Sequence, residues 1–490
     1  MTAGPADLAA RARIEAALLA RRSRTGRAAV PRLPRSEGDN RFPLSPVQHL
    51  MWQLHHDSPT RNTWVTLGGI KLFGALDISA LERAWSALAD RHEALRTVFT
   101  TDGHGEPAQI VRPSGTGRLS FQVVEVTPED ADDAMGAFFD EPFDLCTDPP
   151  GRLRILRVAP DEHHIAIVVH HIVSDGHTMS VLIEELTTLY FACSAGLPSP
   201  LAPLPVQPVD LAAWQGERLT TARRQQLLGY WRTALEGACV PVPPTDVVPL
   251  PEADCTGRTY QLPVSERTVS ALRQLARKQG ATPFMVSLAA FQVLLARYTG
   301  VRDGAVTTPY SCRDRPEADR LVGAFINLLI VRADLSGDPT YLQVLERVRD
   351  RTAADFEHHD LPVAEVIEAL GHELAAGRRD MLRTLFTEED NPAVPDEAEE
   401  ILRSEMVMDP PWHQAERDFT LRVTHDATAG TRIIVTYRTH TYTAARVRDI
   451  AADYRDLLDR IAADPSFHVF DDRGGPPLRV PSAHPVVRGT

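Results

Sequence analysis

A proline-rich stretch near the middle of the chain limits its fold more than any other sequence feature. Residues 196–208 hold five prolines and show neither the periodicity of a helix nor the alternation of a strand. The chain of 490 residues is also longer than one hydrophobic core usually accommodates. We therefore predict two lobes, residues 42–205 and residues 206–473, with their boundary inside this stretch.

The segments at the two ends differ from the lobes. Residues 1–41 carry nine arginines against four acidic residues, and the pattern of residues 6–23 predicts an amphipathic helix. We interpret residues 1–41 as a basic N-terminal extension, either partly ordered with solvated charges or attracted to an acidic partner. Residues 474–490 are predicted to be a flexible tail.

The overall composition argues against several classes of function. A net charge of -14 disfavours broad nucleic-acid binding, because a phosphate backbone requires a basic surface. No run of about 18 apolar residues is present, so we expect no membrane span. The five cysteines lack zinc-site spacing, so we expect reduced thiols and no metal. The remaining expectation is a cytoplasmic protein whose partners are small molecules or proteins.

Helical and strand patterns alternate along both lobes, which predicts an α/β (α+β) fold. Residues 163–171 form the clearest strand pattern, because they are nearly all apolar and β-branched on both faces. Asp77 is a candidate N-cap for a helix over residues 78–91. Further helices are predicted over residues 46–55, 178–190, 222–235, 266–279, 283–298 and 444–463, and further strands over residues 63–72, 324–331 and 431–437.

The string HHIVSDG at residues 170–176 is the main candidate for catalytic chemistry, because it follows a buried strand and precedes a helix. Strand alternation places His170 and His171 on opposite faces, so one imidazole can face a channel while the other is packed. A neutral imidazole can accept a proton from an attacking amine or hydroxyl, which makes His171 the predicted base. Asp175 would fix the loop or bind an arginine, and Gly176 would permit a tight turn.

Six segments, in the same order, resemble the signature motifs of the condensation-domain superfamily of non-ribosomal peptide synthetases. They are residues 44–52 (LSPVQHLMW), 91–99 (RHEALRTVF), 170–176 (HHIVSDG), 210–214 (DLAAW), 322–327 (VGAFIN) and 358–362 (HHDLP). The resemblance covers about residues 42–465.

The resemblance implies two chloramphenicol acetyltransferase-like lobes, arranged as a V-shaped pseudo-dimer with a central tunnel. It implies an acyltransferase that forms an amide or ester in natural product biosynthesis. The donor would be an acyl thioester on a peptidyl or acyl carrier protein, and the acceptor a small-molecule amine or alcohol. The chain itself would bind no cofactor, because the phosphopantetheine arm belongs to the carrier.

The resemblance also assigns roles to single residues. His171 would be the base midway along the tunnel, and His170, Asp175 and Gly176 would complete the catalytic motif. Arg313 would pair with Asp175 across the lobes, which also suits a buried carboxylate that needs a cation.

Two further residues are implied to support the site, Arg91 and Asn327. Arg91 lies in the segment with His92, Glu93 and Arg96, which we interpret as a structural polar network, with direct catalysis as the alternative.

The chain departs from the family pattern at several positions. His177 stands where the family often has an indole, and Leu328 where it often has threonine. The seventh signature, at residues 379–386, lacks the usual serine and proline, and the polar residues 387–390 follow it. We expect altered acceptor-channel chemistry and an altered bridge between the lobes.

Two alternatives stay open beside condensation. One is an epimerase-type member of the same superfamily, although the glutamate-bearing segment expected of epimerases is not recognisable around residues 311–319. The other is a non-catalytic recruitment domain that binds a carrier protein, against which the retained histidine pair argues. No adenylation or carrier segment is recognisable, so we expect a free-standing enzyme with at least one freely diffusing substrate.

Overall fold

The structure is a computed structural model, and the residues that it describes run from 29 to 479 with gaps. They are residues 29–58, 62–101, 104–116, 119–247, 255–370, 380–390, 403–406, 414–426, 430–471 and 478–479. The predicted helix at residues 6–23, most of the N-terminal extension and most of the tail at residues 474–490 lie outside them.

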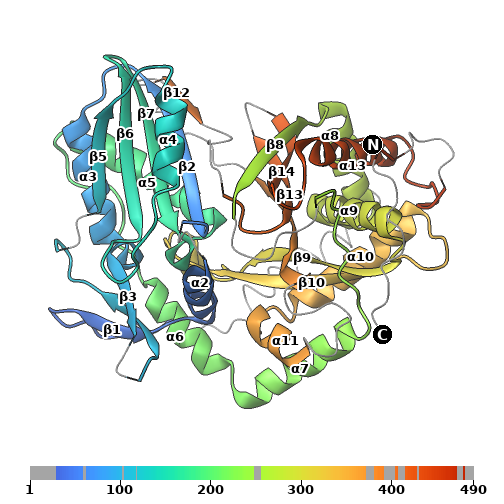
Figure 1. The fold of residues 1–490 in the computed structure, drawn as a ribbon. Helices are drawn as coiled ribbons and strands as arrows, with labels where there is room; N and C mark the ends of the chain where they lie inside the picture. Colours follow the sequence, from blue (N-terminus) through green and yellow to red (C-terminus); the bar gives the residue numbers. More distant parts are fainter. Residues whose placement is uncertain are drawn as a thin grey trace.

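The first lobe is built on a five-stranded sheet in the order β12-β2-β7-β6-β5. Its central strand β7 is buried along nearly its whole length, as the apolar run at residues 163–171 predicts. Figure 1 shows α4 in front of this sheet and α5 behind it. The elements are β2 (Val65–Phe73), α3 (Ile78–Arg91), β5 (Ser120–Glu125), α4 (Ala131–Phe139), β6 (Gly151–Ala159), β7 (Glu162–His170), the short η2 (His171–Val173) and α5 (Gly176–Ser194).

A smaller sheet and two helical segments complete this lobe. The sheet has three antiparallel strands in the order β1-β4-β3. The elements are β1 (Asn40–Pro43), α2 (Pro46–Asp57), η1 (Glu93–Arg96), β3 (Thr97–Thr101) and β4 (Pro107–Val111). Ser45 caps α2 and Asp77 caps α3, and each cap side chain accepts a hydrogen bond from the first turn.

The second lobe surrounds a six-stranded sheet in the order β10-β9-β11-β13-β14-β8. Helix α9 is apolar on almost all sides and lies inside the largest core cluster of the chain. The strands are β8 (Gly257–Pro263), β9 (Asp303–Ser311), β10 (Ile326–Asp334), β11 (Thr384–Asp390), β13 (Phe419–Asp426) and β14 (Gly430–Arg438). The helices are α6 (Pro208–Arg218), α7 (Thr221–Leu235), α8 (Glu266–Lys278), α9 (Pro283–Thr299), η3 (Pro316–Ala318), α10 (Tyr341–Phe356), α11 (Val363–Leu370), η4 (Asp380–Leu382) and α13 (Ala444–Ala463).

One strand crosses from the second half of the chain into the first lobe. Strand β12 (Arg403–Met406) pairs antiparallel with β2, from Arg403 opposite Phe73 to Met406 opposite Ile70. The first lobe's sheet is therefore completed by residues that were predicted to belong to the second lobe. The region in which the eroded seventh signature raised doubt does bridge the lobes.

Residues 29–41 are packed against the lobes, which corrects the prediction of an extension with solvated charges for this part. Val30 is buried in a cluster with Leu204 and Phe325. Arg35 forms ion pairs with Glu93 at 2.8 Å and Asp210 at 3.0 Å. Its charge is thus neutralised by two carboxylates instead of by solvent.

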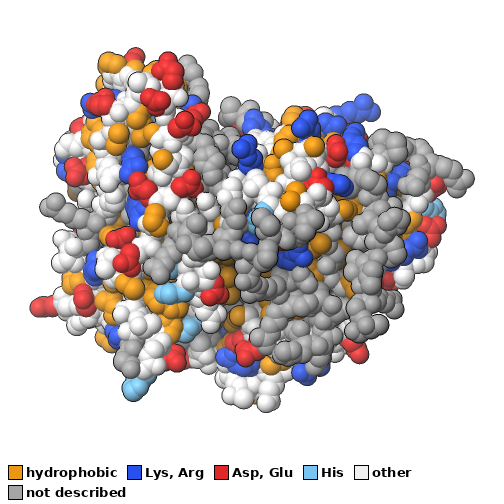
Figure 2. Space-filling model, viewed as in Figure 1, with side chains coloured by type: hydrophobic (Ala, Val, Ile, Leu, Met, Phe, Trp, Pro, Cys, Tyr) orange, Lys and Arg blue, Asp and Glu red, His pale blue; other side chains and the backbone are white. Residues whose placement is uncertain are grey.

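The helices and the surface of the described ranges bear on membrane contact and on charge. Among the described residues no single helix is long and apolar enough to cross a membrane, and α8 and α9 reach that only as a pair bent by 105°. On the face shown in Figure 2, acidic and basic side chains are interspersed over the described surface.

Candidate functional site

A cavity of about 1010 Å³ lies between the lobes and is lined by both of them. The first lobe contributes residues of α2 and β2 together with His171 and Gly176. The second lobe contributes residues of α6, β10, β11 and β14, and the segment that leads into β13. We call this space the interlobe cavity.

His171 is the first residue after β7, and its backbone fixes where the side chain points. The His171 N–H donates to the Trp64 carbonyl at 2.9 Å, which continues the pairing of β7 with β2. The ring Nδ1 lies 3.3 Å from the Ser174 carbonyl oxygen and 3.3 Å from Thr66 Oγ1. With Nδ1 turned to the loop, the opposite nitrogen Nε2 is the atom available for chemistry.

The partner of Nε2 is Glu416, a residue to which no sequence motif pointed. Glu416 Oε1 lies 3.2 Å from His171 Nε2, and both side chains line the cavity. Burial alone lowers the pKa of His171, but the hydrogen bond to Glu416 outweighs burial and raises it above its ordinary value. Burial alone raises the pKa of Glu416, but the hydrogen bond from His171 outweighs burial and lowers it.

His170 lies on the opposite face of the strand, as alternation predicts, and is fully buried. Its Nδ1 accepts from the Ile172 N–H at 3.1 Å, and its Nε2 lies 3.1 Å from His55 Nδ1. Burial, followed by the charges of its histidine neighbours, holds the pKa of His170 well below its ordinary value. A neutral, packed ring outside the cavity positions the strand end and does not contact a reacting group.

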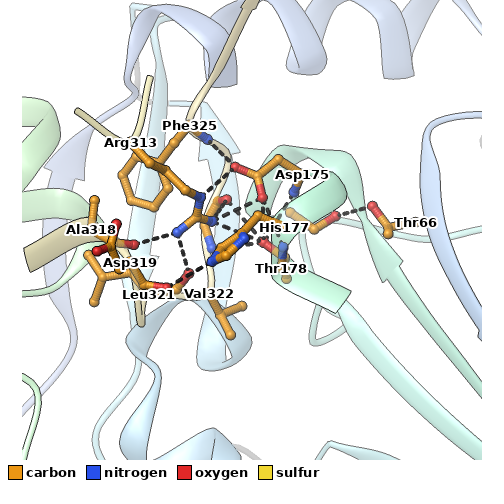
Figure 3. Close-up of polar contacts among 12 residues, drawn as sticks. Thr66, Asp175, His177, Thr178, Arg313, Ala318, Asp319, Leu321, Val322 and Phe325 are labelled. Atoms are coloured by element: carbon orange, nitrogen blue, oxygen red, sulfur yellow. Dashed lines mark hydrogen bonds and ion pairs between the residues drawn. The ribbon is translucent and has the colours of Figure 1, made fainter. Parts of the chain in front are cut away.

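Asp175 pairs with Arg313 across the lobes, as predicted (Figure 3). Asp175 Oδ1 lies 2.9 Å from Arg313 Nη2, Oδ2 lies 3.2 Å from Arg313 Nε, and Oδ2 also accepts from the Phe325 N–H at 3.1 Å. Arg313 donates further to the carbonyls of Leu321 and Gly323. A bidentate pair with this many satisfied atoms is structural, and Asp175 does not line the cavity.

The same aspartate also sets the start of helix α5. Asp175 is the N-cap, and Oδ1 accepts from the Thr178 N–H at 3.0 Å, so α5 begins at Gly176 and not at residue 178. Gly176 does not adopt a positive φ, so the predicted tight turn is wrong. Gly176 instead lies on the cavity wall, where an added Cβ would stand 3.6 Å from Glu389 Oε2.

Arg91 and His92 form a buried network outside the lining of the cavity. Arg91 Nε and His92 Nε2 lie 2.9 Å and 2.6 Å from the same Glu185 oxygen. Burial lowers the pKa of His92 and outweighs the contact with Glu185. These contacts are those of the structural network that we preferred over direct catalysis.

Asn327 supports the site from β10 by holding the segment before α11. Its Nδ2 donates to the carbonyls of His359 and Leu361, each at 2.7 Å. Its Oδ1 accepts from the N–H groups of Leu328 at 2.9 Å and Val363 at 3.0 Å. All four polar contacts of the amide serve the backbone, which suits a supporting role.

The departures from the family pattern fall in different places. Leu328 lines the cavity, but His177 does not, because its Nε2 lies 2.9 Å from the Asp319 carbonyl across the lobes (Figure 3). In the polar end of β11, Thr387 and Glu389 line the cavity, whereas Glu388 points to the other face and pairs with His425. Strand alternation thus divides this acidic run between the cavity and the interior of the lobe.

The capacity to bind a metal ion can be stated for the described ranges alone. Within them, no group of three or more histidine, cysteine, aspartate or glutamate side chains has an arrangement that could hold a metal ion.

A family model described as the condensation domain matches residues 39–471. The linear gramicidin synthase of Brevibacillus parabrevis includes one polypeptide that is 34% identical over 440 residues, which is 87% of this chain and 6% of that protein. The chain therefore spans a small fraction of the relative that it matches.

Two solved structures share the fold. The X-domain in its complex with OxyB from teicoplanin biosynthesis is 26% identical with a TM-score of 0.78, over 91% of this chain and 98% of that one. The condensation domain of the monacolin K polyketide synthase MokA is 23% identical with a TM-score of 0.75, over 88% and 99%. The predicted α+β fold with two acetyltransferase-like lobes is confirmed.

Proposed function

Because the chain belongs to the condensation-domain family of non-ribosomal peptide synthesis, we propose that it joins a carrier-bound acyl thioester to an amine or alcohol acceptor. The observation that carries this function is the position of His171, whose Nε2 faces Glu416 inside a cavity that both lobes line. Two substrates brought together in such a space meet next to a titratable nitrogen.

The chemistry requires one exchange of bonds at the thioester carbonyl. The acceptor nitrogen or oxygen attacks the carbonyl carbon, a C–N or C–O bond forms, and the C–S bond breaks. The proton lost by the acceptor goes to His171 Nε2 and from there to the departing sulfur, which leaves as a thiol. A thioester is already activated, so holding the two reactants in place supplies much of the rate for an amine, whereas a hydroxyl depends more on the base.

The donor would reach the cavity on the phosphopantetheine arm of a peptidyl or acyl carrier protein, which makes the arm part of the substrate. The acceptor would enter as a free small molecule. The polar cavity wall formed by Thr387, Glu389 and Asp390 supports this, because it can solvate the polar groups of an untethered molecule.

A second candidate is a partner-binding domain without catalysis, which the likeness to the X-domain in complex with OxyB favours. Against it stands the paired His170 and His171, with His171 in the cavity. Epimerisation is less well supported, because removal and return of a proton on opposite faces of one carbon needs two groups separated by the substrate. His171 and Glu416 are in direct contact at 3.2 Å, which leaves no space for a carbon between them.

The test is an assay with purified protein, acyl-loaded carrier proteins and pools of amines and alcohols, read by mass spectrometry. Condensation predicts new amides or esters and an unloaded carrier, with no need for a second carrier protein. An epimerised donor, or a stable complex with the carrier without any product, would assign the chain to one of the other two candidates.

A further inference from the structure

Resting on the proposed condensation function, we propose that Glu416 binds the acceptor as an ammonium ion and thereby frees His171 to act as the base. Glu416 is then the acceptor-recognition group of the interlobe cavity, and an amine is preferred over an alcohol. Three features support this role: the anchoring of Glu416, the direction of the two ring nitrogens of His171, and the charges around the pair.

The backbone around Glu416 is held on three sides. The Ala415 N–H donates to the Cys255 carbonyl at 2.7 Å. Arg438 donates to the carbonyls of Ala415 at 3.2 Å and of Glu416 at 3.1 Å. Gly257 packs so closely on this segment that an added Cβ would stand 2.5 Å from the Ala415 Cβ. The carboxylate therefore projects into the cavity from a fixed position.

The ring of His171 determines what Glu416 contacts. Nδ1 lies 3.3 Å from the Ser174 carbonyl, which can only accept, so Nδ1 carries a proton. Nε2 faces a carboxylate at 3.2 Å, and this contact is attractive when Nε2 carries a proton as well. The pair is thus an imidazolium and a carboxylate, and an imidazolium cannot accept a proton from a nucleophile.

An acceptor ammonium ion can take the place of the imidazolium beside Glu416. Its positive charge next to His171 disfavours the protonated ring, so the imidazolium proton passes to solvent and the Nε2 lone pair becomes available. An alcohol carries no charge, leaves the imidazolium–carboxylate pair intact, and so meets no base.

The reaction that follows is balanced. His171 takes one proton from the bound ammonium, and the free amine attacks the thioester carbon. The C–N bond forms, the C–S bond breaks, and the proton on His171 goes to the departing sulfur. The remaining surplus proton on nitrogen is released through Glu416 to solvent, so one ammonium and one thioester give one amide, one thiol and one proton.

The charged groups around the pair come from both lobes. On the first lobe, Asp175 favours the charged form of His171, and the buried His170 lies beside it. On the second lobe, Arg417 and Arg422 are the cations nearest to Glu416.

Both cations have other contacts. Arg417 donates to the Leu382 carbonyl at 2.9 Å and lies 5.7 Å from the Trp64 ring. Arg422 forms an ion pair with Glu389 at 3.1 Å. Among the described residues, His171 is the ion-pair partner of Glu416. A cation that displaces His171 therefore has a carboxylate to bind.

The direct test is an NMR titration of ring-labelled histidines in the whole protein, with benzylammonium and benzyl alcohol as probes of one shape. In the unsubstituted protein, benzylammonium should shift the His171 titration to lower pH, and benzyl alcohol should leave it in place. Glu416→Gln should shift the titration to lower pH without a probe and abolish the response to benzylammonium.

A matched control is Glu162→Gln. Glu162 pairs with His164 Nε2 at 3.0 Å, near the end of β7 away from His171, and does not line the cavity. This variant removes a carboxylate from a glutamate–histidine pair of the same strand. It should leave the His171 titration and its response to benzylammonium unchanged.

The kinetic test compares benzylamine with benzyl alcohol as acceptors for one acyl-loaded carrier. Glu416→Gln should lower kcat/KM for the amine about tenfold, as expected for the loss of one charge-assisted hydrogen bond, and change that for the alcohol less than about twofold. Equal losses for both acceptors would overturn the role of Glu416, and so would a His171 titration that ignores benzylammonium. If no acceptor were condensed at all, the proposed function would fail, while the NMR titration would still decide what Glu416 binds.

Discussion

Two ion pairs cross between the lobes from the same short loop, and they differ in their exposure. The side chains of Asp175 and Arg313 are 5% and 6% exposed, and their polar atoms are occupied by protein donors and acceptors. Those of His171 and Glu416 are 22% and 26% exposed and line the cavity. The first pair is a permanent joint, whereas the second can exchange one partner for a ligand.

The difference explains how one loop serves two purposes. A buried bidentate pair stays intact because separating its partners leaves an unpaired charge in the interior. A half-exposed pair loses much less when it opens, because water replaces the missing partner. The buried joint thus holds the loop in place while the cavity pair changes state.

The largest expected effect breaks the cavity pair on its chemical side. His171→Ala should lower the turnover of condensation about 10²- to 10⁴-fold, the usual contribution of a positioned base. The fold should remain, because the ring of His171 stands in the cavity. Product formation followed by mass spectrometry and unfolding by urea measure the two effects.

His170→Ala is the matched control for that variant. Its ring is fully buried and hydrogen-bonded to the backbone of Ile172, so we expect a loss of about 1–3 kcal/mol in the free energy of unfolding. Near-normal turnover of His171→Ala, together with a large loss in His170→Ala, would move the base to the other ring.

The next effect breaks the buried joint. Asp175→Ala and Arg313→Ala should each lower the free energy of unfolding by about 3–5 kcal/mol, because each leaves the other charge buried and unpaired. The double variant should lose much less than the sum of the two losses, as measured by urea unfolding in a double-mutant cycle.

The control for the joint is an exposed ion pair across the same lobes, between Arg320 and Glu184, whose side chains are 55% and 51% exposed. Arg320→Ala should change the free energy of unfolding by less than about 1 kcal/mol. Additive losses for Asp175 and Arg313, or an equal loss for Arg320, would remove the distinction between a buried joint and a surface contact.

A smaller effect sharpens the contrast at Gly176, which separates the joint from the cavity. Gly176→Ala adds a Cβ at an ordinary contact distance of 3.6 Å from Glu389 Oε2, so the fold should tolerate it. The narrower cavity should lower kcat/KM by roughly two- to tenfold, the range that one methyl group costs in a shaped pocket. Gly229→Ala, with open space around it on α7, should leave both stability and turnover unchanged.

The smallest effect is a pH dependence of stability. The raised pKa of His171 gives stability that is present below the ordinary histidine value of 6.5 and is lost as the pH rises through the folded-state value. The lowered pKa of Glu416 gives stability that is present above the ordinary value of 4.5 and is lost as the pH falls through the folded-state value. The difference in urea midpoint between the unsubstituted protein and Glu416→Gln should therefore be largest between these two pH values. A difference that is constant across pH would show that the two side chains are not an ion pair.

The sequence predicted those features that depend on neighbouring residues. The helices over residues 78–91 and 444–463 have the predicted bounds, because each has an apolar stripe and a clear N-cap. The pair of Asp175 and Arg313 was found because both belong to segments with recognisable motifs. Glu416 was missed because it lies in no motif, and its contact with His171 arises only when β13 is placed opposite β7.

The same limit applies to two contacts between distant segments. Arg35 looked like a solvated charge because its partners Glu93 and Asp210 are far away in the sequence. Strand β12 carries no sign of the strand that it pairs with, since the alternation of apolar residues specifies a face and not a neighbour.

The crossing of β12 decides which pieces of this chain can be exchanged with those of a relative. A swap at the proline-rich stretch would give the first lobe a foreign edge strand, because residues 403–406 belong to the other segment. A chimera that preserves the native sheet must take β12 and β2 from the same parent. For the same reason, a protease cut in the stretch at residues 196–208 would leave two fragments that remain joined by backbone hydrogen bonds and migrate as one particle until denatured.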